Sequence, residues 1–98
     1  TEVKYGVKFH PDALQEFKSL DKGIREILVK KISKRLTNPF IDSARLSGDL
    51  HGLFKIKDRK SGIRIIYKVE VEEKEILVIA VGKRENYLAY VVARKRLQ

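Results

Sequence analysis

The stretch from Phe54 to Arg64 concentrates positive charge, with five Lys or Arg residues and a single acid. In its first half, cations at every second position alternate with Phe54 and Ile56, which is the period of a strand whose two faces meet different environments. A Ser-Gly pair interrupts the pattern, and a second β-rich run begins at Ile63. We therefore predict a β-hairpin with a row of cations on one face, a surface suited to binding an anion.

Two of these cations are predicted to face each other. If residues 59–62 form the loop of the hairpin, Asp58 lies opposite Ile63, and Lys57 lies directly opposite Arg64. Like charges in direct cross-strand contact are destabilising, so a hairpin that holds them there is suited to an anionic ligand. A solvated basic surface with no ligand is the alternative interpretation of the same residues.

Positive charge also dominates the chain as a whole. The 98 residues carry a net charge of +9, of which residues 1–50 supply +3 and residues 51–98 supply +6. Such an excess favours an anionic partner, either nucleic acid or an acidic protein. The chain has no cysteine, which excludes disulfides and thiolate metal sites. No pair of acids suggests a metal site, and no cofactor is expected.

Length and hydropathy define the broad class of protein. Residues 1–98 are expected to form a single domain with a modest core. The longest apolar run, Ile76 to Val81, has six residues, against ~20 for a membrane span. No signal-peptide pattern opens the chain. We therefore expect the cytosol as the compartment and no membrane partner.

Two helices are predicted in the first half of the chain. The first opens at His10-Pro11-Asp12, because proline and aspartate favour the first turn of a helix. The second follows Asp21-Lys22-Gly23 and stops at Asn38-Pro39, because the residue before a proline is pushed out of the helical region. The second helix has a basic side, formed by Lys30, Lys31, Lys34 and Arg35.

Strands supply most of the remaining elements. A short strand is predicted over residues 5–9, a candidate edge segment over 44–46, and a central strand covered on both faces over 75–81. Residues 87–96 are predicted to form a last helix, whose basic end suits the helix dipole. The order β-α-α-β-β-β-α indicates an α+β fold, with an antiparallel sheet, an N-terminal helical hairpin on one face and a C-terminal helix.

A second turn, at residues 72–74, extends the predicted register. With Glu70 opposite Glu75, Arg64 would fall opposite Val81, at the end where Arg84 leaves the sheet. Four cations from distant parts of the chain are then expected to converge, namely Lys55, Lys57, Arg64 and Arg84.

An ordered set of motifs resembles the RelE branch of the RelE/ParE toxin superfamily over nearly the whole chain. The motifs are Phe9-His-Pro-Asp-Ala-Leu14, Leu46-Ser-Gly48, Phe54-Lys-Ile-Lys57, Ser61-Gly-Ile-Arg64, Tyr67, Val81-Gly-Lys-Arg84 and Tyr90. The resemblance implies a compact α+β toxin of a type II toxin–antitoxin pair. A RelE-type member would enter the ribosomal A site and cut mRNA there, whereas a ParE-type member would share the fold and poison DNA gyrase.

The resemblance also implies a set of site residues. Carried over to this sequence, the RelE site would consist of Lys55, Lys57, Arg64, Arg84 and Tyr90. His10 and His51 lie away from these positions, which favours the histidine-free chemistry of the RelE branch. Three further cations are expected to contact RNA phosphate, namely Arg59, Lys60 and Lys83.

Cutting RNA without a metal requires the 2′-hydroxyl to attack its own phosphate, with help from a base and from stabilisation of growing negative charge. Clustered positive charges disfavour protonation of a lysine, so Lys57, assisted by Lys55, is expected near the 2′-hydroxyl, with Arg64 on the phosphate. The resemblance places Arg84 at the leaving oxygen. Tyr90 would stack on a base or orient the sugar.

The resemblance implies as partners a cognate antitoxin, the ribosome with its RNA, mRNA, and operator DNA only together with the antitoxin. The alternative to a metal-independent endoribonuclease is a protein without nuclease activity, either a ParE-like gyrase inhibitor or a basic co-repressor module. The basic side of the second helix would either contact ribosomal RNA phosphates or face water, and the sequence does not separate these.

Overall fold

The computed structural model describes residues 4–41, 44–46, 52–83 and 95–96. Its elements in chain order are strand β1 (Gly6–Phe9), helices α1 (Pro11–Lys18) and α2 (Lys22–Thr37), and strands β2 (Leu53–Asp58), β3 (Ile63–Glu70) and β4 (Glu75–Lys83). The predicted α+β class is confirmed. The predicted last helix, residues 87–96, falls outside the described residues except for Lys95 and Arg96, which are helical.

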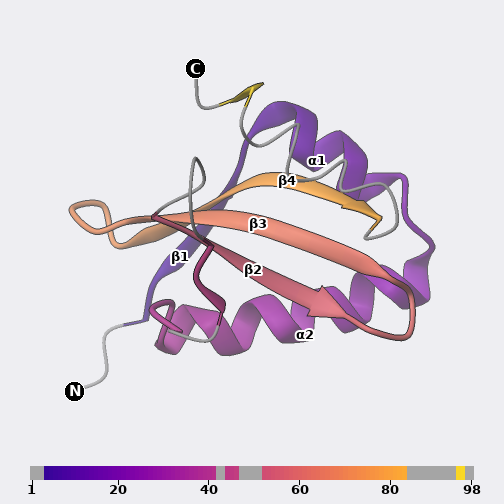
Figure 1. Cartoon of the computed structure of the whole chain (residues 1–98), viewed down its shortest axis with the longest axis horizontal. Helices are drawn as coiled ribbons and strands as arrows, with labels where there is room; N and C mark the ends of the chain where they lie inside the picture. Colours follow the sequence, from indigo (N-terminus) through magenta and orange to yellow (C-terminus); the bar gives the residue numbers. More distant parts are fainter. Residues whose placement is uncertain (1–3, 42–43, 47–51, 84–94, 97–98) are drawn as a thin grey trace.

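The four strands form one sheet in the order β1-β4-β3-β2 (Figure 1). Strands β2, β3 and β4 form an antiparallel meander, whereas β1 pairs with β4 in parallel. The sheet is therefore mostly antiparallel. Strand β4 lies inside the sheet, as its apolar sequence predicts, and β2 lies at one edge.

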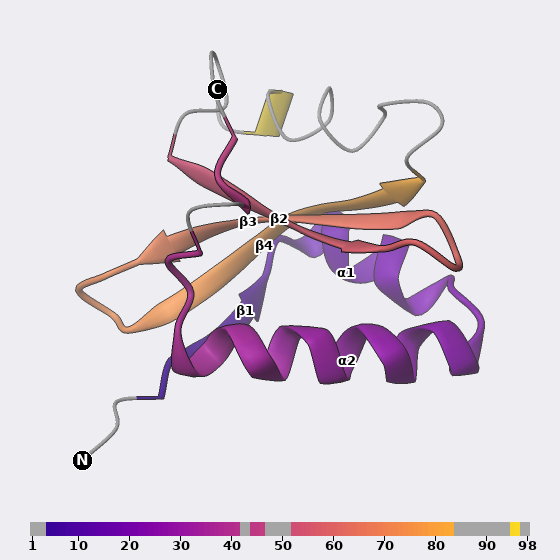
Figure 2. The same ribbon diagram turned by 60° about the horizontal axis from the view of Figure 1, so that its bottom comes forward.

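Both helices lie on the same face of the sheet (Figure 2). The buried residues of α2 recur four positions apart, at Leu28, Ile32 and Leu36, so one stripe of the helix meets the sheet. These side chains pack in one cluster with Ile56, Ile65 and other sheet residues. Each fully buried side chain of this kind contributes ~1.5–3 kcal/mol, and this cluster is the main core. None of the helices in the described part of the chain is long and apolar enough to cross a membrane.

The helix boundaries follow local sequence signals. The backbone N–H of Asp12 donates to Nδ1 of His10 over 3.1 Å, so His10 caps the first turn of α1. Helix α2 ends at Thr37, before Asn38-Pro39. Its cap is Asp21 and Lys22 is its first residue, so Gly23 lies inside the first turn rather than in a separating turn.

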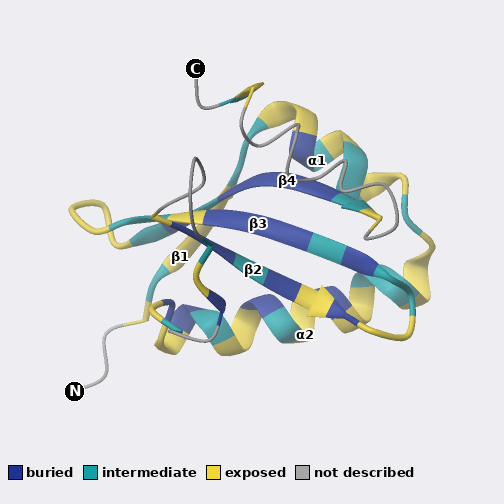
Figure 3. Cartoon of the chain, in the orientation of Figure 1, coloured by how far each residue is buried: buried dark blue, intermediate teal, exposed yellow. Residues whose placement is uncertain are grey.

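The face of the sheet opposite the helices has a different composition. It carries a smaller apolar cluster of Leu53, Ile66, Ile79 and Ala80, packed with Leu46 and Leu77. Buried residues alternate with more exposed ones along the middle of β2 (Figure 3). Because side chains alternate between faces, Lys55, Lys57 and Arg64 share this second face with Ile66.

The predicted register of the first hairpin is confirmed. Strand β2 ends at Asp58 and β3 begins at Ile63, with Lys57 opposite Arg64. Gly62 closes the turn with a positive φ of 74°, a conformation that glycine adopts without strain. The segment at residues 44–46 also lies at the edge of the sheet, where Arg45 bridges to Phe54.

The predicted register of the second hairpin is wrong by one residue at its far end. Glu70 does pair with Glu75, but Arg64 pairs with Gly82 rather than Val81. The shift falls between Ile66 and Tyr67, whose partners are Ala80 and Val78, so Ile79 is an extra residue in β4. This β-bulge leaves Val81 on the helix side of the sheet, in the main core, and Arg64 on the other side.

Candidate nucleic-acid interface

The β2–β3 hairpin brings two predicted site residues into one cross-strand pair, Lys57 and Arg64. Both line a small pocket of about 20 Å³ together with Arg59 and the turn residue Gly62. Lys57 is exposed and Arg64 is partly buried. The pair therefore presents two positive charges on one side of the sheet, in a position where an anion would relieve their mutual repulsion.

The turn between the strands is fixed by Asp58, the last residue of β2. Oδ2 of Asp58 accepts hydrogen bonds from the backbone N–H of Ser61 over 3.1 Å and from its Oγ over 2.7 Å. These hydrogen bonds are the main reason why the pKa of Asp58 lies below its ordinary value. The carboxylate is thus directed into the turn. The turn places Arg59 and Lys60 at the end of the hairpin.

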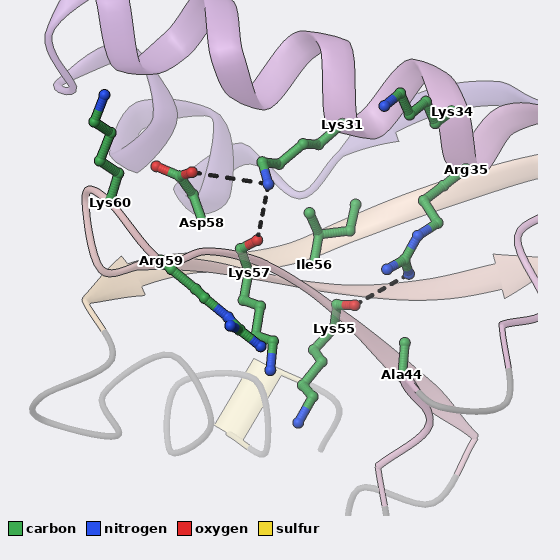
Figure 4. Close-up of a pocket in the computed structure, with 10 residues that line it drawn as sticks. All are labelled: Lys31, Lys34, Arg35, Ala44, Lys55, Ile56, Lys57, Asp58, Arg59 and Lys60. Atoms are coloured by element: carbon green, nitrogen blue, oxygen red, sulfur yellow. Dashed lines mark hydrogen bonds and ion pairs between the residues drawn. The ribbon is translucent and has the colours of Figure 1, made fainter.

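A larger groove of about 710 Å³ opens between α2 and the edge strand β2 (Figure 4). Among the ten described residues that line it, seven are Lys or Arg and one, Asp58, is an acid. Helix α2 contributes Lys31, Lys34 and Arg35, and the hairpin contributes Lys55, Lys57, Arg59 and Lys60. We call this feature the basic groove.

Two cations of α2 are held against the backbone of β2. Nζ of Lys31 donates to the carbonyl oxygen of Lys57 over 3.3 Å and lies 3.8 Å from Oδ1 of Asp58. Nη1 of Arg35 donates to the carbonyl oxygen of Lys55 over 3.1 Å. In the described sheet β2 is an edge strand, so these carbonyl groups point outward, and the side chains of Lys31 and Arg35 donate hydrogen bonds to them.

A buried tyrosine fixes Arg35 from the other side. Nη1 of Arg35 also donates to the hydroxyl of Tyr67 over 3.0 Å, and that hydroxyl donates to the carbonyl oxygen of Pro39 over 2.7 Å. Tyr67 is 0% exposed, and burial raises the pKa of its hydroxyl. The neutral hydroxyl therefore joins Arg35, which lines the basic groove, to the backbone that follows α2.

The structure brings together most of the predicted site residues that it describes. Lys55, Lys57, Arg59 and Lys60 all line the basic groove, and Arg64 adjoins it through its pairing with Lys57. Lys83 pairs with Ile63, so strand alternation assigns it to the face opposite that of Arg64. Three residues named in the sequence analysis, Arg84, Tyr90 and His51, lie outside the described residues.

The groove also contains cations that were not among the predicted site residues. Lys31, Lys34 and Arg35 belong to the basic side of α2, and they follow one another at helical spacing, which signals a common face. That signal was present in the sequence. What the sequence did not reveal is that β2 is the edge strand beside α2, which is the arrangement that turns this helix face toward the hairpin.

The chemistry available in the described part of the site is that of a cation cluster. The basic groove and the Lys57–Arg64 pair can neutralise phosphate oxygens and stabilise charge that develops on them. Among the described residues, no group of His, Asp and Glu side chains is arranged to hold a metal ion. The arrangement therefore suits the sugar–phosphate backbone of a nucleic acid, which carries one negative charge at each phosphodiester group.

Comparison with known proteins agrees with this interpretation. Residues 7–87 match a family model described as the ParE toxin of type II toxin–antitoxin systems. A RelE-like toxin protein of Escherichia coli is 45% identical over 96 residues, covering 98% of this chain and 100% of that protein. The mRNA interferase toxin RelE of Escherichia coli strain K12 is 40% identical over 95 residues, covering 97% of this chain and 99% of that protein.

Solved structures show the same relationship. An arginine double mutant of the E. coli toxin RelE in the free state has a TM-score of 0.87 and 38% identity, covering 97% of this chain and 99% of that one. A chain of the intact E. coli RelBE toxin–antitoxin complex has a TM-score of 0.77 and 39% identity, covering 81% and 95%. The chain therefore belongs to the RelE/ParE superfamily of type II toxin–antitoxin toxins, and to its RelE branch.

Proposed function

We propose that this protein is the toxin of a type II toxin–antitoxin pair and that it cuts mRNA in the ribosomal A site without a metal. The observation that carries the proposal is the direct pairing of Lys57 with Arg64 at the margin of the basic groove. A nearby relative is named an mRNA interferase toxin. A cation pair of this kind can stabilise negative charge that develops on a phosphoryl group during RNA cleavage.

The reaction we propose is attack by a 2′-hydroxyl on its own phosphate, with departure of the 5′-oxygen. Lys57, assisted by Lys55, takes the hydroxyl proton, and Arg64 stabilises negative charge on the phosphoryl oxygens. Removing one such charge-stabilising donor typically costs ~10²–10³ in rate. Arg84 is assigned to the leaving oxygen, and Tyr90 to stacking on a base or orienting the sugar.

Dependence on the ribosome is implied by the resemblance to the RelE branch, and the proposed chemistry is consistent with it. Arginine does not readily give up a proton, so the proposed site is poor in ordinary acids. Pre-arranged reactants can lower a barrier by several kcal/mol. We propose that the ribosome supplies this arrangement by holding mRNA in a distorted, in-line geometry, and that the free protein cuts RNA slowly.

A cognate antitoxin is the second proposed partner. The RelE relative has been solved in a RelBE complex, and a net charge of +9 favours association with an acidic or amphipathic chain. We propose that operator DNA is bound only when the antitoxin is present. Inhibition of DNA gyrase is a second candidate function, because the matching family model is described as the ParE toxin.

In vitro translation tests the proposal. Purified protein is added to ribosomes programmed with a defined message, and the mRNA ends are mapped. We expect cuts within the A-site codon, and we expect Arg64→Ala and Arg84→Ala to abolish them while the variants still fold and bind antitoxin. Undiminished cutting by either variant would remove that residue from the site. Intact mRNA together with cleaved plasmid DNA in a gyrase assay would instead establish the second function.

A further inference from the structure

The basic groove extends well beyond the residues that the proposed reaction uses. Its α2 side, formed by Lys31, Lys34 and Arg35, lies across the edge of β2 from Lys55 and Lys57. Figure 4 shows the side chains of Lys55 and Lys57 directed away from α2, so that the cations line both sides of the strand edge. One continuous surface of positive charge therefore runs from the Lys57–Arg64 pair to the helix.

Asp58, the one acid among the described residues of the groove, does little to neutralise it. Asp58 is occupied by two hydrogen bonds from Ser61 and faces one cation, Lys31. With seven Lys or Arg residues and one acid, the part of the lining that the structure describes keeps a formal excess of six positive charges. Such an excess calls for a ligand with several negative charges rather than a single carboxylate or phosphate.

The cations are arranged in two rows with similar spacing. Lys31 and Arg35 are one helical turn apart, or ~6 Å along the axis of α2. Lys55 and Lys57 are two residues apart on a strand, or ~6.6 Å. Hydrogen bonds from the side chains of Lys31 and Arg35 to the backbone carbonyl groups of β2 hold the first row against the second. Two such rows fit a chain whose charges repeat at regular intervals.

The described residues of the groove do not provide the apolar centre that is typical of an interface with a protein partner. Its two aliphatic residues, Ala44 and Ile56, are 5% and 2% exposed and belong to the main core. Protein–protein interfaces have an apolar core and are depleted of charge there, whereas interfaces with nucleic acid are polar and strongly positive. The composition of the lining thus favours a nucleic-acid backbone over an acidic polypeptide.

We infer that Lys31, Lys34 and Arg35 form a second phosphate-binding subsite, which takes the continuation of the single RNA strand that lies on Lys55, Lys57 and Arg64. The inference rests on the proposed function for the identity of that strand as mRNA. The subsite contacts the sugar–phosphate backbone and is insensitive to base sequence. It adds affinity and orientation to the strand and takes no part in bond breaking.

Salt-dependent binding of an uncleavable RNA tests the subsite. Fluorescence anisotropy is measured with a labelled single-stranded 2′-O-methyl oligonucleotide, in which the attacking hydroxyl is blocked. Each phosphate contact on a single strand contributes ~0.7 to the slope of log K against log salt. The double variant Lys31→Gln/Lys34→Gln should therefore lower the slope by ~1.4 and weaken binding at low salt.

The matched control is Lys22→Gln/Lys30→Gln, which removes the same charge from exposed positions of the same helix outside the groove. We expect it to change the slope by much less. Equal losses in both double variants would overturn the inference, because they would indicate diffuse attraction. If Lys31→Gln compromises folding, Lys34→Gln alone, at an exposed position, should lower the slope by ~0.7.

Two further arms separate the alternatives. A loss of slope seen with an RNA duplex and absent with the single strand would overturn the continuous-strand subsite, since it would assign the cations to ribosomal RNA helices. Weaker antitoxin binding with an unchanged RNA slope would overturn it in favour of an acidic protein partner. Cleavage on programmed ribosomes is scored separately, so a failure of the proposed nuclease function leaves the binding result interpretable.

Discussion

The two faces of the β2–β3 hairpin are built from alternate residues of the same strands, and next to the turn they differ sharply in burial and charge. On the helix side, Ile56 and Ile65 are 2% and 0% exposed and pack into the main core. On the other side, Lys57 and Arg64 form a cross-strand pair of like charges. The difference indicates how one hairpin can contribute to the core with one face and present the proposed reactive cations on the other. Burial on the helix side offsets the cost of placing two like charges opposite each other.

The largest expected effects come from two neighbouring residues on opposite faces. Ile65→Ala should lower the free energy of unfolding by ~2–5 kcal/mol, because it opens a cavity in a fully buried site. Arg64→Ala should change the unfolding free energy by much less and should lower A-site cleavage by ~100-fold or more. Urea unfolding and end-mapping of mRNA measure the two effects.

Activity per folded molecule decides between the two kinds of effect. Ile65→Ala should retain the cleavage activity per folded molecule at temperatures where the variant is folded. If Ile65→Ala folds fully and yet fails to cut, or if Arg64→Ala is severely unfolded, the assignment of stability to one face and cleavage to the other is wrong.

A smaller effect is expected from Tyr67→Phe, on the helix side. The substitution removes a buried hydroxyl that donates to the carbonyl oxygen of Pro39 and accepts from Arg35. Leaving a buried acceptor unsatisfied costs ~1–3 kcal/mol, so the free energy of unfolding should fall by that amount. Tyr5→Phe, at a partly exposed tyrosine, is the control. Equal stability of Tyr67→Phe and the parent would show that the hydrogen bonds of the Tyr67 hydroxyl are not needed for stability.

The comparison of faces also explains which parts of the fold could be predicted from the sequence. The register of the first hairpin was predictable, because β2 alternates strictly and a Ser-Gly pair fixes the loop. The bulge at Ile79 was not, because Ile76 to Val81 is apolar at every position and contains no alternation that would fix the pairing. A strand covered on both faces accepts either register on hydrophobic grounds alone.

The candidate site was predictable to a similar extent. Residues on one hairpin, such as Lys57 and Arg64, could be placed together, because local pairing determines their distance. The approach of Lys31 and Arg35 to the same groove could not, because it depends on the order of strands in the sheet. The parallel pairing of β1 with β4 escaped prediction for the same reason, since it is a contact between distant segments.

The end of β4 is a second edge of the sheet, because β1 pairs with β4 only as far as Val78. Beyond that point, side chains form hydrogen bonds with the backbone of β4. Glu16 accepts from the backbone N–H of Val81 over 3.2 Å, and Arg96 donates to the carbonyl oxygen of Ile79 over 2.6 Å and to Glu16 over 3.0 Å. Glu16→Gln keeps an acceptor for Val81 but removes the ion pair, and should cost ~1 kcal/mol. Thermal unfolding measures it. A larger loss than for Tyr67→Phe would reverse this ranking.

The smallest expected effect concerns the turn that joins the two faces, and it depends on pH. The pKa of Asp58 is lowered below its ordinary value of 3.8, chiefly by the hydrogen bonds from Ser61. A group whose pKa is lower in the folded state stabilises the fold above its ordinary pKa, and this contribution is lost as the pH falls through the folded-state value. Asp58→Asn should therefore be less stable than the parent at pH 7, and the free energies of unfolding of the two proteins should converge below pH 3.8.

The control is Glu72→Gln, which removes a charge from an exposed turn position and should show no such convergence. A stability difference for Asp58→Asn that persists unchanged at acid pH would mean that the shape of the turn, and not the carboxylate charge, holds the cations of the hairpin in place.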